Sequence, residues 1–254
     1  MNDALIGHTG FVGGTLLRAR SFDACFRSTN IDAIRGRTFD TIYCCGAPAE
    51  KWRANRNPEE DRLRLATLTD ALREARSTRF VLISTIDVYP CVNGPDERTP
   101  IDAEASEPYG LHRYALEQFC RAHFATTIVR LPGLYGYGLK KNAVFDLLND
   151  RPLDGVPGNA RFQFYDVARL HTDVEHILAS GFDVVNITPE PVSMSDVAEQ
   201  VFGRTMSTPY ADDAPNYDVR SVHADLAGGR DGYWFSADVV FDGLRDFVAS
   251  ERAR

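Results

Sequence analysis

The stretch Gly7-His8-Thr9-Gly10-Phe11-Val12-Gly13 follows the apolar run Ala4-Leu5-Ile6 and opens a segment with apolar residues at helical spacing. This pattern predicts a strand, a glycine turn and a helix. Glycine lets the backbone turn tightly and approach a pyrophosphate, whose negative charge is attracted by the N–H groups at the start of a helix. The segment therefore predicts a dinucleotide-binding site, although a glycine turn also joins strands to helices for packing alone.

Composition excludes several classes of partner. The 254 residues have room for one α/β core with a small appendage, and their formal net charge of -8 would repel nucleic acid or an anionic membrane. No basic leader precedes the first apolar run, no run is long enough to cross a bilayer, and the five cysteines form no C-x-x-C pair. We expect a cytoplasmic protein with reduced thiols that binds neither nucleic acid nor membrane.

Short β-rich apolar runs alternate with helical patterns along the chain. The runs cover residues 4–6, 24–26, 41–45, 80–84, 127–131 and 184–187. Such alternation predicts an α/β fold in which helices cover both faces of a doubly wound, parallel sheet of the Rossmann type. The connection over residues 31–40 is very short for a crossover helix.

Two helices are predicted between these runs. The first follows Asn57-Pro58-Glu59-Glu60, which combines an N-cap residue, a proline and an acid, and its apolar positions are Leu65, Leu68, Leu72 and Ala75. The second runs from about Pro108 to His123, and its predicted apolar stripe is Leu111, Ala115, Phe119 and Ala122.

Glycine and proline become dense from Pro132 onward. We therefore expect residues 132–162 to form loops above the carboxyl edge of the sheet that contribute to a substrate cleft. The predicted domains are a dinucleotide-binding core over residues 1–187 and a small substrate lobe over residues 188–254.

Three further stretches fall where a nucleotide-dependent redox site would need them. They are Ser84-Thr85-Ile86-Asp87-Val88-Tyr89, Tyr109-Gly110-Leu111-His112-Arg113 and Arg130-Leu131-Pro132-Gly133-Leu134-Tyr135-Gly136. With the glycine turn, this series resembles the extended short-chain dehydrogenase/reductase family, which includes NAD-dependent sugar epimerases and dehydratases. The resemblance is in register over about residues 4–138. It implies a carbohydrate-like substrate, an NAD or NADP cofactor, and a homodimer formed through the helices around residues 58–76 and 108–123.

The resemblance implies that Thr85 and Tyr109 are the catalytic pair. A phenol with a pKa of about 10 accepts a proton at neutral pH only if positive charge stabilises its phenolate, and a cation four residues later on a helix lies on the same face. The family has lysine at that position, whereas this chain has Arg113. Arginine can lower the pKa of Tyr109 and contact the cofactor ribose, but it cannot lose a proton. Spacing alone favours an exposed surface pair for Tyr109 and Arg113, whereas the resemblance favours the catalytic pair.

Asp87 is the fourth catalytic candidate. Sugar-nucleotide dehydratases of the family carry an Asp-Glu pair directly after the catalytic threonine, and the sequence Ile86-Asp87 matches only the second acid. Its carboxylate could move a proton beside the substrate carbonyl, or it could simply cap the strand end. The family's asparagine that contacts the substrate diphosphate is replaced here by Gly133.

The predicted cofactor-binding residues come from several segments. They are Gly7, Thr9, Gly10, Phe11, Val12, Gly13, Arg27, Ser28, Gly46, Ala47, Tyr109, Arg113 and Pro132. NAD enzymes place an acid about twenty residues after the first glycine, where this chain has Arg27 and Ser28. A cation and hydroxyls suit a 2′-phosphate, so NADP is favoured, although Arg27 could also just face water. Asp32 is the acid that would support NAD instead.

Four other polar or aromatic features allow more than one interpretation. His171 and Glu175 have metal-ligand spacing but no evident third ligand, so we assign them to a solvated helix face and expect no metal. His8 is expected to contact backbone or a cofactor phosphate. Lys140 and Lys141 could bind an anion, but a solvated loop is favoured, and packing is favoured over a cleft role for residues 162–166.

These observations predict an NAD(P)-dependent sugar epimerase, dehydratase or reductase that transfers hydride between the nicotinamide and a carbohydrate-like alcohol or carbonyl. The alternative is a non-catalytic NADP(H)-binding protein that senses redox state and acts through a protein partner. Replacement of the motif lysine and of the asparagine favours that alternative.

Overall fold

The chain forms two units in the computed structural model, which describes residues 2–153 and 155–254. The first unit comprises Met1–Pro90, Thr99–Arg130 and Leu170–Val185. The second unit comprises Cys91–Arg98, Leu131–Arg169 and Asn186–Arg254. Each unit therefore draws on segments that are distant in the sequence.

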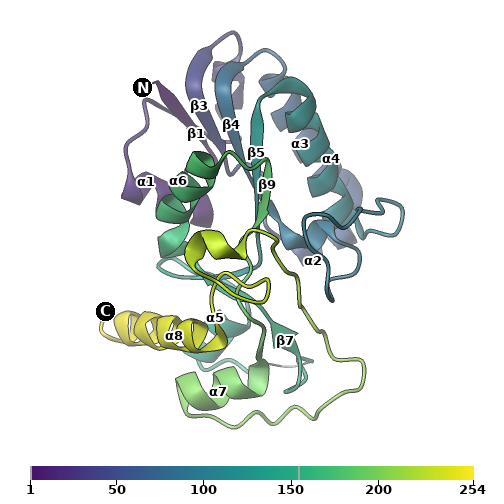
Figure 1. The fold of residues 1–254 in the computed structure, drawn as a ribbon, viewed down its shortest axis with the longest axis vertical. Coiled ribbons are helices and arrows are strands. Elements are labelled where there is room, and N and C mark those ends of the chain that lie inside the picture. Colours follow the sequence, from purple (N-terminus) through teal and green to yellow (C-terminus); the bar gives the residue numbers. More distant parts are fainter. Residues whose placement is uncertain (1, 154) are drawn as a thin grey trace. The chain divides into compact units, whose positions relative to one another are not determined.

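A six-stranded sheet carries the first unit, with the order β2-β1-β3-β4-β5-β9 (Figure 1). Its strands are β1 (Asp3–Ile6), β2 (Ala24–Phe26), β3 (Thr38–Cys44), β4 (Arg76–Thr85), β5 (Thr126–Leu131) and β9 (Val184–Asn186). β1 pairs in parallel with β2 and β3, and β3 pairs in parallel with β4. The predicted Rossmann-type fold and all six predicted strands are confirmed. The short connection between β2 and β3 forms only a 3₁₀ turn, η1 (Ile31–Ile34).

Helices α3 and α4 lie together against the sheet, while α1 and α6 contact each other elsewhere in the first unit (Figure 1). The helices of this unit are α1 (Phe11–Ala19), α2 (Lys51–Arg56), α3 (Pro58–Leu72), α4 (Pro108–His123) and α6 (Leu170–Ser180). The predicted apolar residues Leu65, Leu68 and Leu72 of α3 are buried in one core with residues of β1 and β3, as expected. Asn57 takes the N-cap position, but its side chain makes no capping hydrogen bond.

The limits of α4 agree with the prediction, but its buried face does not. Leu111 and Ala115 of the predicted stripe are exposed, whereas the buried residues are Tyr109, Gly110, Arg113, Leu116, Glu117 and Cys120. The reason is that this helix buries charged side chains that are paired with opposite charges. A prediction based only on apolar residues cannot identify such positions as buried. Arg113 binds Asp61, and Glu117 binds Arg130 through two hydrogen bonds of 2.6 and 3.0 Å.

The second unit has its own small core. Its elements are β6 (Gly133–Tyr135), α5 (Ala143–Leu148), β7 (Arg161–Phe162), β8 (Phe164–Asp166), η3 (Val167–Arg169), β10 (Val192–Ser193), α7 (Met194–Phe202), η4 (Ala224–Ala227) and α8 (Ala237–Arg252). Residues 132–162, predicted as loops of the first domain, instead group with this unit. Val144 and Leu147 of α5 pack with residues of α7 and α8, which explains the grouping.

No described helix is long and apolar enough to span a membrane. The five cysteines are free thiols, and Cys44 and Cys120 are fully buried. Within residues 2–153 and 155–254, no group of three or more His, Cys, Asp or Glu side chains is placed to hold a metal ion.

Candidate active site

The glycine turn after β1 is packed so closely that two of its positions exclude any side chain. A Cβ atom at Gly7, whose φ is +84°, would lie 2.3 Å from the carbonyl oxygen of Cys45. A Cβ atom at Gly13 would lie 2.3 Å from the carbonyl oxygen of Gly7. Helix α1 begins directly after Gly10, which has no side chain to cap its first N–H groups. This cradle fits a diphosphate.

The glycine turn lies at the point where the strand order reverses. β1 has β2 on one side and β3 on the other, and open α/β sheets bind ligands outside the carboxyl ends of strands at such a point. Gly46 and Ala47 follow β3 there, and a Cβ atom at Gly46 would lie 3.0 Å from a methyl carbon of Ile6. Two of the predicted cofactor segments are therefore adjacent.

The loop after β2 is joined to the same turn. The Gly7 N–H donates to the carbonyl oxygen of Phe26 (2.8 Å), and Nδ1 of His8 lies 3.0 Å from that oxygen, which is the backbone contact expected for His8. Arg27 and Ser28, directly after Phe26, are exposed. Asp32 instead accepts a hydrogen bond from Arg35 (3.0 Å).

Thr85, Asp87 and Tyr109 come together at the carboxyl end of β4. Thr85 ends this strand, and Asp87 lies in the 3₁₀ turn η2 (Ile86–Val88). The Asp87 N–H donates to Thr85 Oγ1 (3.1 Å), and that hydroxyl lies 3.3 Å from Asp87 Oδ2. Thr85 lies close enough to Tyr109, which is 7% exposed, for its hydroxyl to lower the pKa of the phenol. Three of the four predicted catalytic residues therefore form one connected group.

Gly110 allows the start of α4 to lie close to the turn η2. A Cβ atom at Gly110 would lie 2.1 Å from the carbonyl oxygen of Asp87. Because real Cβ atoms do not approach backbone oxygen so closely, any larger residue would separate α4 from η2. The residue after Tyr109 thus sets the distance between Tyr109 and the strand end.

Burial raises the pKa of Tyr109 to about 12. The positive charges of Arg113 and Lys51 and the hydroxyl of Thr85 act in the opposite direction, while the charge of Asp87 adds to the rise. The guanidinium carbon of Arg113 lies 4.0 Å from the centroid of the Tyr109 ring. In this state Tyr109 is a neutral phenol at neutral pH.

Arg113 is engaged by a carboxylate that the sequence did not single out. Its Nη2 donates to Asp61 Oδ1 (2.9 Å), its Nη1 contacts the other oxygen of Asp61, and Nη2 also contacts the carbonyl oxygen of Pro48. Both charged side chains are buried, with exposed fractions of 2% and 6%. The alternative of an exposed surface pair is thus excluded, and the ribose contact predicted for Arg113 stays a prediction. Asp61 lies four residues before Leu65, so the spacing of the buried face of α3 could have indicated it.

Helix α2 places a second cation beside the site. Lys51 Nζ lies 2.7 Å from Asp87 Oδ1 and 4.0 Å from Glu107 Oε2. Four residues later, Asn55 Oδ1 accepts a hydrogen bond from the N–H of Tyr109 (2.9 Å), which fixes α2 against the start of α4. No local pattern in the sequence marks α2, so nothing short of the fold brings Lys51 to the site.

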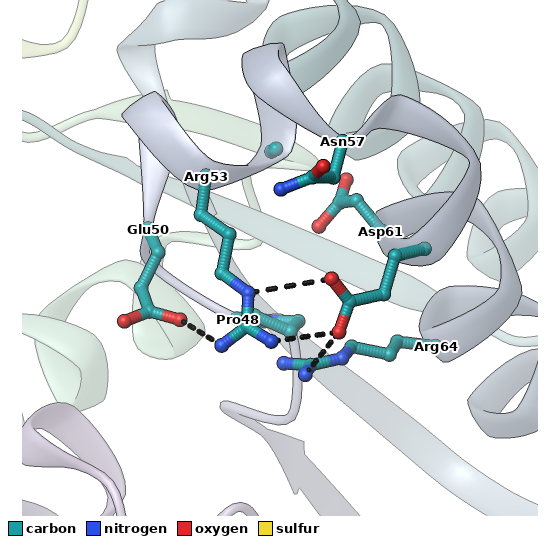
Figure 2. Close-up of a pocket in the computed structure, with 8 residues that line it drawn as sticks. Pro48, Glu50, Arg53, Asn57, Asp61 and Arg64 are labelled. Atoms are coloured by element: carbon teal, nitrogen blue, oxygen red, sulfur yellow. Dashed lines mark hydrogen bonds and ion pairs between the residues drawn. The ribbon is translucent and has the colours of Figure 1, made fainter.

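A small hollow beside α2 is occupied by ion pairs (Figure 2). Arg53 lies 3.6 Å from Glu50 and 2.7 Å from Glu60, and Arg64 also lies 2.6 Å from Glu60. The hollow measures about 10 Å³, enough for about one water molecule. It therefore offers no room for a sugar or a nucleotide.

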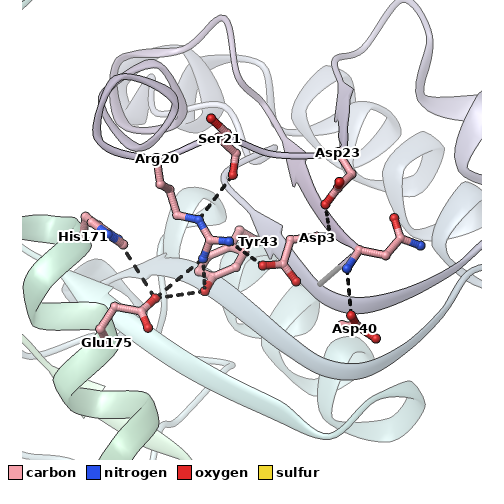
Figure 3. A network of polar contacts seen from close by, with 9 residues as sticks. Asp3, Arg20, Ser21, Asp23, Asp40, Tyr43, His171 and Glu175 are labelled. Atoms are coloured by element: carbon pink, nitrogen blue, oxygen red, sulfur yellow. Dashed lines mark hydrogen bonds and ion pairs between the residues drawn. The ribbon is translucent and has the colours of Figure 1, made fainter.

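The predicted metal-like pair His171 and Glu175 belongs to a polar network instead (Figure 3). Glu175 Oε1 lies 4.0 Å from His171 Nδ1 and accepts a hydrogen bond from the Tyr43 hydroxyl (3.1 Å). Arg20 lies 3.7 Å from the same oxygen and also binds Asp3. These contacts tie α6 to β1 and β3, so the helix face is not merely solvated.

The remaining predicted residues belong to the second unit. Pro132 is half-buried between β5 and β6, and a Cβ atom at Gly133 would lie 3.0 Å from the carbonyl oxygen of Gln163. Phe164 and Tyr165 are buried, in agreement with packing, and Lys140 is exposed.

Comparisons with known proteins agree with this architecture. A family model described as the NAD dependent epimerase/dehydratase family matches residues 19–155. A search of curated proteins found no match. Many solved structures share the fold, among them MoeE5 in complex with UDP-glucuronic acid and NAD, with 19% identity, a TM-score of 0.75 and coverage of 100% of both chains.

Two further structures widen the comparison. UDP-glucose 4-epimerase from Thermotoga maritima, solved with UDP-glucose, shows 17% identity and a TM-score of 0.71 over 100% of this chain and 99% of that one. A dTDP-4-dehydrorhamnose reductase from Bacillus anthracis, solved with NADP, shows 18% identity and a TM-score of 0.73 over 98% and 99%. At these identities, the likeness shows the fold.

Proposed function

Because this chain belongs to the NAD dependent epimerase/dehydratase family and is thus an NAD(P)-dependent enzyme, we propose that it transfers hydride between the nicotinamide and the sugar of a nucleotide sugar. The observation that carries this proposal is the group formed by Thr85, Asp87 and Tyr109 at the end of β4. A threonine hydroxyl, a carboxylate and a buried phenol in contact are suited to proton transfer beside a carbonyl.

The glycine cradle would hold the cofactor diphosphate, with Gly7, Gly10 and Gly13 allowing close approach of the backbone. Arg27 and Ser28 would lie at the adenosine ribose, and their chemistry favours the 2′-phosphate of NADP. When bound, the nicotinamide supplies the hydride acceptor and, after reduction, the hydride donor.

In the proposed reaction, Thr85 donates a hydrogen bond to the reacting oxygen of the substrate. Tyr109 gives its proton to that oxygen when a carbonyl is reduced, and its phenolate takes the proton when an alcohol is oxidised. Its raised pKa suits the first role directly, while the second requires the positive charge of Arg113 and Lys51 nearby.

A nucleotide sugar is proposed as substrate because structures with the same fold were solved with UDP-glucuronic acid and UDP-glucose. Gly133 in place of the family's asparagine means that the diphosphate would be bound without that side chain. Enzymes of this kind act on the sugar carbons, so epimerisation, dehydration and reduction all remain within the proposal.

We further propose a cytoplasmic homodimer formed through α3 and α4. These helices expose two large apolar side chains, Leu63 (53%) and Leu111 (36%), which would be covered in a dimer. The free thiols are typical of a reducing compartment. Light scattering at working concentration would contradict the dimer if it reported a single chain.

The decisive test is turnover by a tyrosine variant. Purified protein is incubated with NADH or NADPH and a panel of UDP- and dTDP-sugars, and cofactor oxidation and product sugars are measured. Tyr109→Phe should lose turnover by at least about 100-fold while its cofactor affinity, measured by calorimetry, stays unchanged. Tyr114→Phe on the same helix is the matched control. Full activity of Tyr109→Phe would contradict the proposal, and cofactor binding without turnover of any sugar would favour the redox-sensing alternative.

A further inference from the structure

We propose that Lys51 and Asp87 form, with Thr85, the path by which the phenol proton of Tyr109 exchanges with solvent. In this proposal Asp87 is the relay group and Lys51 a positioning residue that holds its carboxylate. The inference rests on the proposed function, in which Tyr109 gains and loses a proton in each turnover.

Arg113 cannot provide this path. A guanidinium does not lose its proton in proteins, and both terminal nitrogens of Arg113 already bind Asp61 or the carbonyl oxygen of Pro48. Arg113 therefore supplies charge beside Tyr109 but cannot accept and pass on the phenol proton. Because Tyr109 is only 7% exposed, its proton needs another route to water.

The contacts on the other side of Tyr109 form a continuous chain. Tyr109 lies beside Thr85, whose hydroxyl lowers the pKa of the phenol. Thr85 Oγ1 in turn lies 3.3 Å from Asp87 Oδ2. The other carboxylate oxygen, Oδ1, accepts a hydrogen bond from Lys51 Nζ (2.7 Å). Exposure increases along this chain, because the side chains of Asp87 and Lys51 are 18% and 41% exposed. The chain thus leads from a buried phenol to the surface.

The proton balance of the path is simple. When Tyr109 releases its phenol proton, Thr85 Oγ1 accepts it and passes its own hydroxyl proton to Asp87 Oδ2. Asp87 then releases one proton to water and returns to the carboxylate, which the ammonium of Lys51 stabilises. One proton leaves Tyr109, one proton enters the solvent, and no electron moves; the reverse sequence reprotonates Tyr109.

The path can be tested without cofactor or substrate, by the exchange rate of the Tyr109 hydroxyl proton. The protein is labelled with tyrosine carrying ¹³C at Cζ and dissolved in equal parts of water and deuterium oxide, where slow exchange gives two resolved signals and fast exchange gives one. Tyr109→Phe assigns the signal. Asp87→Asn should slow the exchange on the order of 100-fold, since an amide does not accept the proton. Lys51→Met should slow it to a smaller extent, and Lys51→Arg should restore it.

Slower exchange in Asp87→Asn cannot arise from charge alone. The charge of Asp87 raises the pKa of Tyr109, so its removal lowers that pKa and, without a relay, would speed exchange. Glu107→Gln is the matched control, since Glu107 also lies near Lys51 but has no bond to Thr85 in the structure. The proposal is overturned if Asp87→Asn exchanges as fast as this control. Lys51→Met, at a position that is only partly buried, provides a second test of the proposal should Asp87→Asn fail to fold.

The two proposals fail in different experiments. Full turnover by Tyr109→Phe would contradict the proposed function, whatever the proton exchange rates are. If proton exchange is unchanged in Asp87→Asn and Lys51→Met while Tyr109→Phe is inactive, only the proposal of the proton path is contradicted.

Discussion

Arg113 on α4 binds Asp61 on α3, and both charged side chains are buried. The pair joins two helices that flank the candidate site, and it places the guanidinium against the ring of Tyr109. Asp61 also lies 2.8 Å from His112 Nδ1, so one carboxylate holds two consecutive residues of α4. The position of Tyr109 is thus set from the neighbouring helix as well as from its own.

Replacing Asp61 should therefore destabilise the protein strongly. Asp61→Asn leaves Arg113 as a buried cation without its counter-charge, and we expect a loss of about 3–5 kcal/mol in the free energy of unfolding. Urea denaturation measures it. Glu59→Gln, at an exposed ion pair on the same helix, should leave the transition unchanged. Equal midpoints for the two variants would contradict the role assigned to Asp61.

The same carboxylate predicts acid sensitivity. Burial disfavours its charged form, but hydrogen bonds from Arg113 and His112 outweigh burial and hold the pKa of Asp61 below its usual value. A lowered pKa stabilises the folded state above the unfolded pKa of about 4, and this stabilisation is lost as pH falls through the folded pKa. Unfolding free energies measured across that range should fall for the wild type and less steeply for Asp61→Asn. Parallel curves would argue against the prediction.

Gly110→Ala should reduce stability and activity together. The added Cβ atom would meet the carbonyl oxygen of Asp87 at 2.1 Å, so α4 must move away from η2 at a cost of about 1–3 kcal/mol. The movement separates Tyr109 from Thr85, and turnover should fall. Gly14→Ala is the control, because its Cβ atom would have no neighbour closer than 3.5 Å and alanine favours a helix by about 0.5–1 kcal/mol. Thermal unfolding and turnover are measured for both variants. Equal unfolding temperatures and equal turnover in Gly110→Ala and Gly14→Ala would contradict the prediction.

Arg27→Ala should change cofactor choice. If Arg27 binds the 2′-phosphate, its loss removes a charged hydrogen bond of about 1.5–3 kcal/mol and weakens NADPH binding roughly 10- to 100-fold. NADH binding should stay the same, which provides the internal control. Calorimetry measures the affinity for both nucleotides. The assignment is rejected if the affinities for NADPH and NADH fall equally, or if neither falls.

Local signals in the sequence were sufficient to predict much of the fold. Gly7 to Gly13 after an apolar run gave β1, the turn and α1, and Pro108 to His123 gave the limits of α4. Each of these predictions depends on spacing within a short segment, which a single sequence displays. The pairing of Thr85 with Tyr109, by contrast, came from the resemblance to the extended short-chain dehydrogenase/reductase family, and the structure places the two residues at strand and helix ends that meet.

Contacts between distant segments could not be predicted in this way. Asp61 and Arg113 are 52 positions apart, and Lys51 and Asp87 are 36 apart, so no local pattern pairs them. Arg113 and Glu117 are buried, which contradicts the predicted apolar stripe. A charged side chain can be buried when an oppositely charged partner compensates for the loss of water, and a pattern of apolar residues does not show this. The packing of residues 132–162 with α7 and α8 likewise depends on partners that follow much later in the chain.

The link from Asp61 to Arg113 has a consequence for protein engineering. A chimera that transplants only the helix bearing Tyr109 into another scaffold would import a buried cation without its counter-ion and a phenol without its lysine neighbour. The smallest transferable module is discontinuous: it must carry residues 48–72 together with residues 85–87 and 107–117, and also Arg130, the partner of the buried Glu117.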